Sequence, residues 1–204
     1  MKNSTNLEAG LLPFIPEAAL EMTCSLLRQY PHHLVITPPR STVHGDFRPG
    51  RDRHTLTVNG DRNRYAFLIT LLHEMAHLIT FNTHASSVKP HGKEWKSDFV
   101  KLLRPYLESG IFPADITDAL KRYMLNPAAA TCSDINLSKV LSRYDKKEDG
   151  ELLLDDLPVG ALFMYRDKRK FVKETKRRTR WICKEVSTGQ TYFFSPVTLV
   201  KMVS

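Results

Sequence analysis

"LLHEMAHLITFNTHASSVKPHGKEW", residues 71–95, contains four histidines, at positions 73, 77, 84 and 91. His73 and His77 are four residues apart, and Glu74 directly follows the first, as in the pattern HExxH. On a helix these two histidines lie on one face, so both can reach one zinc ion at about 2.1 Å. A chance match is the alternative, but the apolar neighbours predict a buried helix, in which polar side chains need partners.

A catalytic zinc ion usually has three protein ligands and one water molecule. On a continuous helix His84 would lie about 10 Å beyond His77, at 1.5 Å per residue, and we therefore predict that it belongs to the following loop. His91 comes after that loop and directly before Gly92, which gives the chain room to reverse. Glu94 is an alternative ligand, since some zinc peptidases use a glutamate from the next helix. We prefer His91 as the third ligand.

Glu74 is the candidate catalytic residue. A bound zinc ion lowers the pKa of its water to about 7, and a neighbouring carboxylate can then accept the proton. The hydroxide attacks a carbonyl, and the proton passes to the leaving amine. These steps describe peptide-bond hydrolysis with one zinc ion as cofactor.

The hydrophobic pattern predicts an α+β fold in two domains. Residues 1–125 alternate between helical spacing and short strands, with Asp61 as the expected N-cap of the HExxH helix. Residues 126–156 are predicted to be a connector with a short helix. Residues 157–204 contain short strands and turns, with a hairpin at Ser187–Gln190, and are predicted to form a small β domain.

Composition favours a soluble, cytoplasmic protein. The 204 residues are 42% hydrophobic and 25% charged, and we see neither a secretory signal nor a membrane-spanning apolar segment. The three cysteines, Cys24, Cys132 and Cys183, are widely spaced, so we expect reduced thiols and no cysteine-based zinc ribbon. "DKKEDGELLLDD" (145–156) resembles a calcium loop, but Lys147 stands where an oxygen ligand belongs, and we reject calcium binding.

The net charge of +8 lies entirely in the last part of the chain. Residues 160–204 carry 11 Lys and Arg against 3 Asp and Glu, whereas residues 1–159 carry 19 of each. Phe171 and Trp181 are interleaved with these basic residues, a composition that can neutralise phosphates and stack on unpaired bases. The alternative is a solvated basic surface whose aromatic residues lie in the core. The candidate nucleic-acid residues are Lys176, Arg177, Arg178 and Arg180.

"LLHEMAH" followed by "HGKEWK" resembles the SprT-like metallopeptidases, over roughly residues 15–110. The resemblance implies a zincin-like domain in which His73, His77 and His91 bind zinc and Glu74 is catalytic. Relatives of the Spartan type are DNA-dependent proteases that degrade proteins crosslinked to DNA. Many members also carry a C-terminal zinc ribbon. Here "RRTRWICKEVSTGQTYFF" resembles its strand order without the paired cysteines, so a second zinc ion is not expected.

These observations predict a zinc metalloendopeptidase that acts on protein or peptide substrates, including proteins associated with nucleic acid. DNA, single-stranded or crosslinked, is the expected partner of the basic β domain, and no membrane partner is expected. An extended substrate is predicted to pair with a strand edge near Thr55–Val58. The alternative is a non-catalytic nucleic-acid-associated factor, with a role in transcription or repair, that keeps zinc as a structural element.

Overall fold

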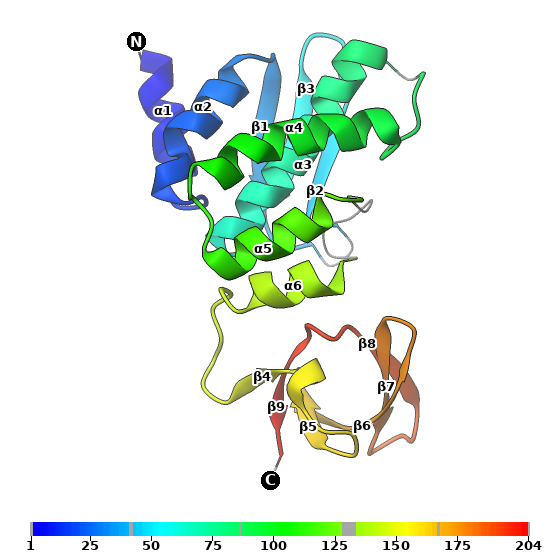
Figure 1. The fold of residues 1–204 in the computed structure, drawn as a ribbon. Coiled ribbons are helices and arrows are strands. Elements are labelled where there is room, and N and C mark those ends of the chain that lie inside the picture. Colours follow the sequence, from blue (N-terminus) through cyan, green and yellow to red (C-terminus); the bar gives the residue numbers. More distant parts are fainter. Residues whose placement is uncertain (1, 41–42, 86, 128–133, 167, 204) are drawn as a thin grey trace. The chain divides into compact units, whose positions relative to one another are not determined.

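The computed structural model describes residues 2–40, 43–85, 87–127, 134–166 and 168–203. It combines helices with two sheets, which confirms the α+β class (Figure 1). The chain divides into two compact units, Met1–Tyr144 and Asp145–Ser204. Among the described residues, no helix has the length and apolar composition needed to cross a membrane.

The sheet of the first unit has the strand order β1-β3-β2. β1 (His32–Thr37) runs parallel to β3 (His54–Asn59), and β2 (Gly45–Arg48) runs antiparallel to it. The predicted free edge near Thr55–Val58 is therefore wrong. These residues lie in the central strand, whose backbone pairs on both sides, and the edges belong to β1 and β2.

The HExxH helix is α3 (Arg64–His84), and its side chains are buried over most of its length. It packs against β2 and β3 on one side and against α4 (Lys93–Glu108) on the other. Its N-cap is Asn63 and not Asp61 as predicted. The extended backbone of Asn63 lets its side-chain oxygen accept hydrogen bonds from the first-turn amides of Tyr65 and Ala66, at 3.1 and 2.9 Å.

Short helices complete the first unit around a single core of buried apolar residues. The first of them, which the sequence analysis did not anticipate, precedes Pro13. Their bounds are α1 (Lys2–Leu11), the 3₁₀ helix η1 (Glu17–Ala19), α2 (Leu20–Arg28), α5 (Ala114–Tyr123) and α6 (Ile135–Ser142).

The helix predicted inside the connector is α6, and it packs against α5. The Asn63 side-chain amide donates to the carbonyl of Leu141 at 2.9 Å, and the Tyr144 hydroxyl donates to Asp115 at 2.7 Å. These contacts explain why the two units divide after Tyr144, so that the helix of the predicted connector lies in the first unit and its strand in the second.

The second unit is a six-stranded sheet with the order β4-β9-β5-β6-β7-β8. Its core is rich in aromatic side chains, with Phe163, Phe171 and Phe194 in mutual contact. The predicted turn at residues 187–190 joins β7 to β8. The elements are β4 (Glu151–Leu153), the 3₁₀ helix η3 (Leu154–Asp156), β5 (Leu162–Tyr165), β6 (Arg169–Arg177), β7 (Arg180–Glu185), β8 (Thr191–Phe194) and β9 (Leu199–Met202).

A buried carboxylate in this unit predicts how its stability depends on pH. Arg169 and Thr188 donate to Glu185 at 2.7 and 2.6 Å, and chiefly the bond from Arg169 lowers the pKa of Glu185 from 4.5 to about 2. Because the folded pKa is depressed, the stabilisation is fully present above about pH 4.5 and is lost as the pH falls towards 2.

Glu185→Gln should therefore lower the melting temperature at pH 7 and make little difference near pH 2. Calorimetry at both pH values measures the difference in melting temperature between variant and wild type. For the control Glu174→Gln this difference should not shrink at low pH. A difference for Glu185→Gln that is the same at pH 7 and near pH 2 would contradict this explanation.

Candidate metal centre

Three histidines converge beside the middle of the first unit's buried helix. His73 and His77 lie one turn apart on α3, and His91 lies two residues before α4. The Nε2 atom of His91 is 3.1 Å from that of His73 and 2.8 Å from that of His77. All three ligand atoms lie within 4.8 Å of one another, so the group could hold a metal ion.

The other two candidates for the third ligand lie outside this group. His84 is the last residue of α3, because the helix continues through the segment predicted to be a loop. Glu94 lies in the first turn of α4 and has its nearest charged partner in Lys93, at 3.7 Å. Of the three candidates, therefore, only His91 is brought to His73 and His77.

The backbone before α4 turns sharply to present His91. His91 has φ +56°, in the left-handed region that residues with a Cβ rarely adopt. Gly92 then donates its amide to the carbonyl of Lys89, and a Cβ at position 92 would lie 2.9 Å from that oxygen. A side chain at Gly92 would therefore disturb the turn. Such local strain is typical of functional sites.

Trp95 forms an apolar wall behind the three histidines. Its side chain is 1% exposed, and its ring centroid lies 4.6 Å from His73, 5.2 Å from His77 and 4.6 Å from His91. In the sequence, Trp95 is only one of several apolar residues at helical spacing in this segment. Its contact with all three imidazoles depends on how α4 crosses α3.

A hydrogen bond between α3 and α4 helps to hold that crossing. The Thr80 hydroxyl, which is buried, donates to the Asp98 carboxylate at 2.8 Å. Thr80 is one turn beyond His77, and Asp98 is one turn beyond Trp95. The bond therefore fixes the two helices close to the cluster.

The protein environment favours neutral imidazoles in this cluster. Burial, followed by the neighbouring imidazoles, lowers the pKa of His73 to about 3 and that of His77 to about 4, and burial also lowers the pKa of His91. A histidine must be neutral to bind a metal, so protons compete weakly here at neutral pH. Three neutral nitrogen ligands within 4.8 Å of one another suit a divalent transition metal.

Glu74 lies beside the cluster but is not a member of it. Glu74 is only 6% exposed, and this burial raises the pKa of its carboxyl to about 8. The negative charge of Asp46 adds to the increase in pKa, and the positive charge of Arg40 opposes it. A cation held by the three histidines would favour the carboxylate form. Glu74 is thus a buried carboxyl that directly follows His73 on α3.

The edge strand β2 lies very close to this glutamate. A Cβ built on Gly45 would be 2.6 Å from Oε1 of Glu74, 2.9 Å from its Cγ and 2.8 Å from the methyl carbon of Thr70. Two residues later, the ring of Phe47 lies nearly parallel to that of His77, with centroids 6.4 Å apart. β2 therefore follows the helix face that carries Glu74 and His77. The sequence analysis did not identify Gly45 as important.

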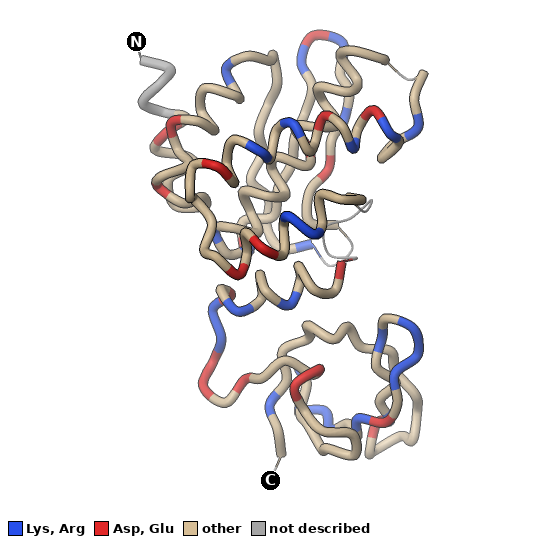
Figure 2. Tube along the Cα trace, viewed as in Figure 1, with Lys and Arg blue, Asp and Glu red and all other residues tan. Residues whose placement is uncertain are grey.

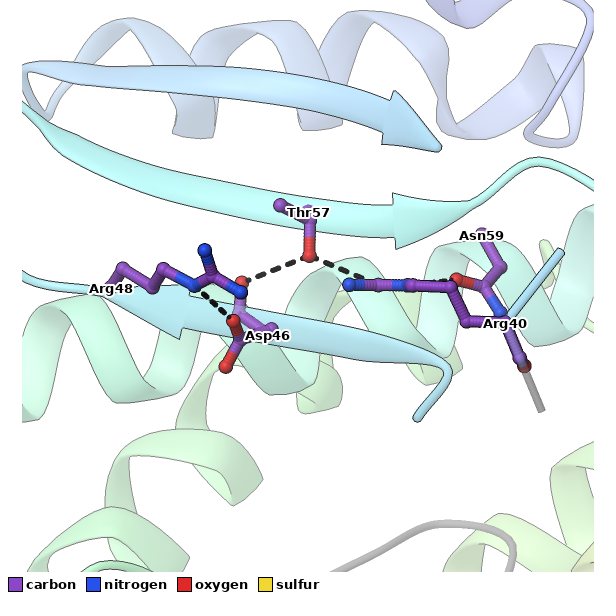
Figure 3. Close-up of polar contacts among 5 residues, drawn as sticks. All are labelled: Arg40, Asp46, Arg48, Thr57 and Asn59. Atoms are coloured by element: carbon purple, nitrogen blue, oxygen red, sulfur yellow. Dashed lines mark hydrogen bonds and ion pairs between the residues drawn. The ribbon is translucent and has the colours of Figure 1, made fainter. Parts of the chain in front are cut away.

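A polar network on the other face of the sheet holds the entrance to β2 (Figure 3). The side-chain oxygen of Asn59, a residue that is 1% exposed, accepts a bond from Arg40 at 2.8 Å. Its amide donates to the backbone carbonyls of Arg40 and Val43, at 3.2 and 3.0 Å. Arg40 also donates to Thr57 at 3.0 Å, and Thr57 donates to the backbone carbonyl of Asp46. Asn59 in the central strand thus holds Arg40 and Val43, which precede β2 in the chain.

The four predicted nucleic-acid residues lie in the second unit, around the turn between β6 and β7. All four are exposed, but they do not share one environment. Lys176 lies 3.3 Å from Asp155 and 5.3 Å from the ring centroid of Trp181, whereas Arg177 pairs across the hairpin with Arg180.

Comparison with known proteins gives one family result. The model described as the SprT-like family matches residues 56–105, which contain most of β3, all of α3, the three histidines and most of α4. This match confirms the resemblance predicted from the histidine motif. No curated protein and no solved structure gives a significant match.

Histidine substitutions test the ligand assignment. His91→Ala should lose the bound metal, because it removes one of the three converging nitrogens. His84→Ala is the matched control and should keep wild-type metal content, which elemental analysis of the purified proteins measures. Full metal in the His91 variant together with loss in the His84 variant would overturn the assignment.

A second prediction concerns the contact between Gly45 and Glu74. Gly45→Ala should destabilise the protein by about 1–3 kcal/mol, because the added methyl group overpacks the contact. Glu74→Ala removes two of the three atoms that crowd this methyl group, Oε1 and Cγ, and leaves the methyl carbon of Thr70, so the cost of the Gly45 substitution should fall in this background without vanishing. Urea unfolding of both single variants and the double variant measures the coupling. Gly10→Ala is the control, because no atom lies within 4 Å of its new Cβ. An equal cost in both backgrounds would show that β2 does not depend on Glu74.

Proposed function

We propose that this protein, whose residues 56–105 match the SprT-like family, is a zinc-dependent metallopeptidase with a zincin-like first unit. The observation that carries the proposal is the position of Glu74. It lies on α3 between two of the three converging histidines, is buried, and is not itself one of the converging ligands.

In this proposal His73, His77 and His91 hold one zinc ion through their Nε2 atoms. When bound, zinc acts as a Lewis acid that makes a water molecule acidic near neutral pH. Glu74 accepts the proton on its carboxylate and delivers it to the leaving amine of the substrate. Trp95 excludes solvent behind the imidazoles, and Gly45 leaves room for the Glu74 carboxylate.

The edge of β2 is the proposed place for an extended peptide substrate. Within the described residues β2 pairs only with β3, so its other edge can accept a further strand. Gly45 and Phe47 place this edge beside Glu74 and His77, as described above. A peptide paired there would pass next to the proposed metal site. Pairing with a strand edge requires that this segment of the substrate is extended.

The alternative is a non-catalytic factor that uses zinc only for stability. Structural zinc sites usually have four protein ligands, whereas catalytic sites have three and leave one position for water or substrate. The cluster found in the described part of the chain has three members. This ligand number and the adjacent Glu74 favour catalysis.

Glu74→Gln separates the two functions. The amide cannot accept the proton, so cleavage of an unfolded protein such as casein should fall by about 10²–10⁴-fold, while metal content stays at the wild-type level. Gel-based cleavage rates and elemental analysis measure the two effects, and Glu94→Gln is the matched control because Glu94 lies outside the cluster. The assay is repeated with single-stranded DNA and with a DNA-bound protein substrate. Cleavage that survives in Glu74→Gln would contradict the mechanism, and a zinc-loaded wild type that cleaves nothing in any of these assays would favour the structural alternative.

A further inference from the structure

One face of the sheet in the second unit exposes an aromatic ring. In β8 the side chains alternate, so Phe194 is 8% exposed and packs in the core, whereas Phe193 is 49% exposed. Phe193 pairs with Ile182 of β7, which therefore lies on the same outer face. Exposure of an apolar phenylalanine ring to water does not stabilise the fold. Aromatic rings on the surface of a sheet are common stacking sites for nucleic-acid bases.

Basic residues surround this ring on the same face. Arg180 and Lys184 lie two positions before and two positions after Ile182, and Arg177 pairs with Arg180 across the hairpin. All three are exposed, and within the described part of the chain none of them forms an ion pair. Figure 2 shows Lys and Arg grouped around the turn between β6 and β7.

Phe171 and Trp181, the aromatic residues that the sequence interleaves with basic ones, are not on this face. Phe171 is 1% exposed. Trp181 faces the inner side of the sheet, where the ammonium of Lys173 lies 3.7 Å from its ring centroid and its indole nitrogen donates to Asp155. Lys176 belongs to the same inner group through its ion pair with Asp155. Of the three aromatic residues Phe171, Trp181 and Phe193, only Phe193 therefore lies on the outer face together with exposed basic residues that have no ion pair among the described residues.

We propose that this outer face binds single-stranded nucleic acid without sequence preference. Arg177, Arg180 and Lys184 would contact phosphates, and Phe193 would stack on one base. Cationic and aromatic side chains on neighbouring strands fit this ligand, because the bases of a single strand expose the flat faces that a duplex stacks internally. Glu174 is the acidic residue of this face, which leaves the three basic residues in excess. Binding at this face does not depend on the peptidase activity.

Binding of a fluorescein-labelled oligothymidine to the full-length protein tests this surface by anisotropy across a salt series. Arg177→Gln/Arg180→Gln should weaken binding and reduce the slope of log K against log salt by about 0.7 for each phosphate that the variant no longer neutralises. Phe193→Ala should weaken binding about five-fold or more with an unchanged slope, because stacking releases no counterion. Phe193→Tyr, which keeps a ring, should bind almost as the wild type does. A duplex of equal length should bind more weakly than the single strand.

Two control variants match the change in charge and in apolar surface. Lys121→Gln/Arg122→Gln removes two exposed charges from α5, and Val159→Ala removes an exposed apolar side chain from the second unit. Neither should weaken binding as its counterpart does, and thermal melts check that every variant is folded. If the Phe193→Ala variant is unfolded, the Phe193→Gln and Lys184→Gln variants are measured in the binding assay instead. Equal losses in the controls, no effect of the Phe193 substitution, or equal binding of the duplex would each overturn the proposal.

Discussion

The fold of the first unit is built around a buried helix, α3, that carries polar residues among its buried side chains. α3 lies between the sheet and α4, where a side chain that cannot find a polar partner is costly. His73 and Glu74 are both 6% exposed, and the imidazole Nδ1 of His73 has no hydrogen-bond partner among the described residues. Keeping such groups in a core sacrifices stability, so the convergence of His73 with His77 and His91, next to the buried Glu74 in the sequence, is best explained by a function.

The elements around α3 each restrict this polar cluster in a different way. α4 supplies Trp95 as an apolar wall and is tied to α3 through Asp98. β2 approaches so closely that a glycine is needed opposite Glu74. Asn59, in the neighbouring strand, holds the backbone of Arg40 and Val43 before β2. The geometry around the histidine cluster thus depends on the close approach of the β2 backbone as much as on the histidines themselves.

The second unit also buries a polar group, the side chain of Lys173, but there the group has hydrogen-bond partners within the protein. Lys173 is 1% exposed, but its ammonium donates to the backbone carbonyls of Asp155 and Leu157 and lies over the ring of Trp181. A buried lysine of this kind is tolerated because carbonyl oxygens and an aromatic face replace its water. This arrangement uses Trp181 internally and leaves the outer face of the sheet to Phe193 and the arginines.

The sequence by itself predicted the α+β class, most helices and strands, and the cluster of His73, His77 and His91, because helical periodicity and ligand spacing are local properties. It did not predict the strand order, and it therefore assigned the free edge to Thr55–Val58 instead of β2, since strand pairing depends on residues far apart in the chain. The importance of Gly45 and Asn59 also came only from the tertiary structure, because a glycine or an asparagine carries no signal of what packs against it. The same holds for the exposed basic surface: composition located the positive charge in residues 160–204, but only the alternation of side chains across paired strands separated Phe193 and Arg180 from the inward-facing Trp181 and Lys176.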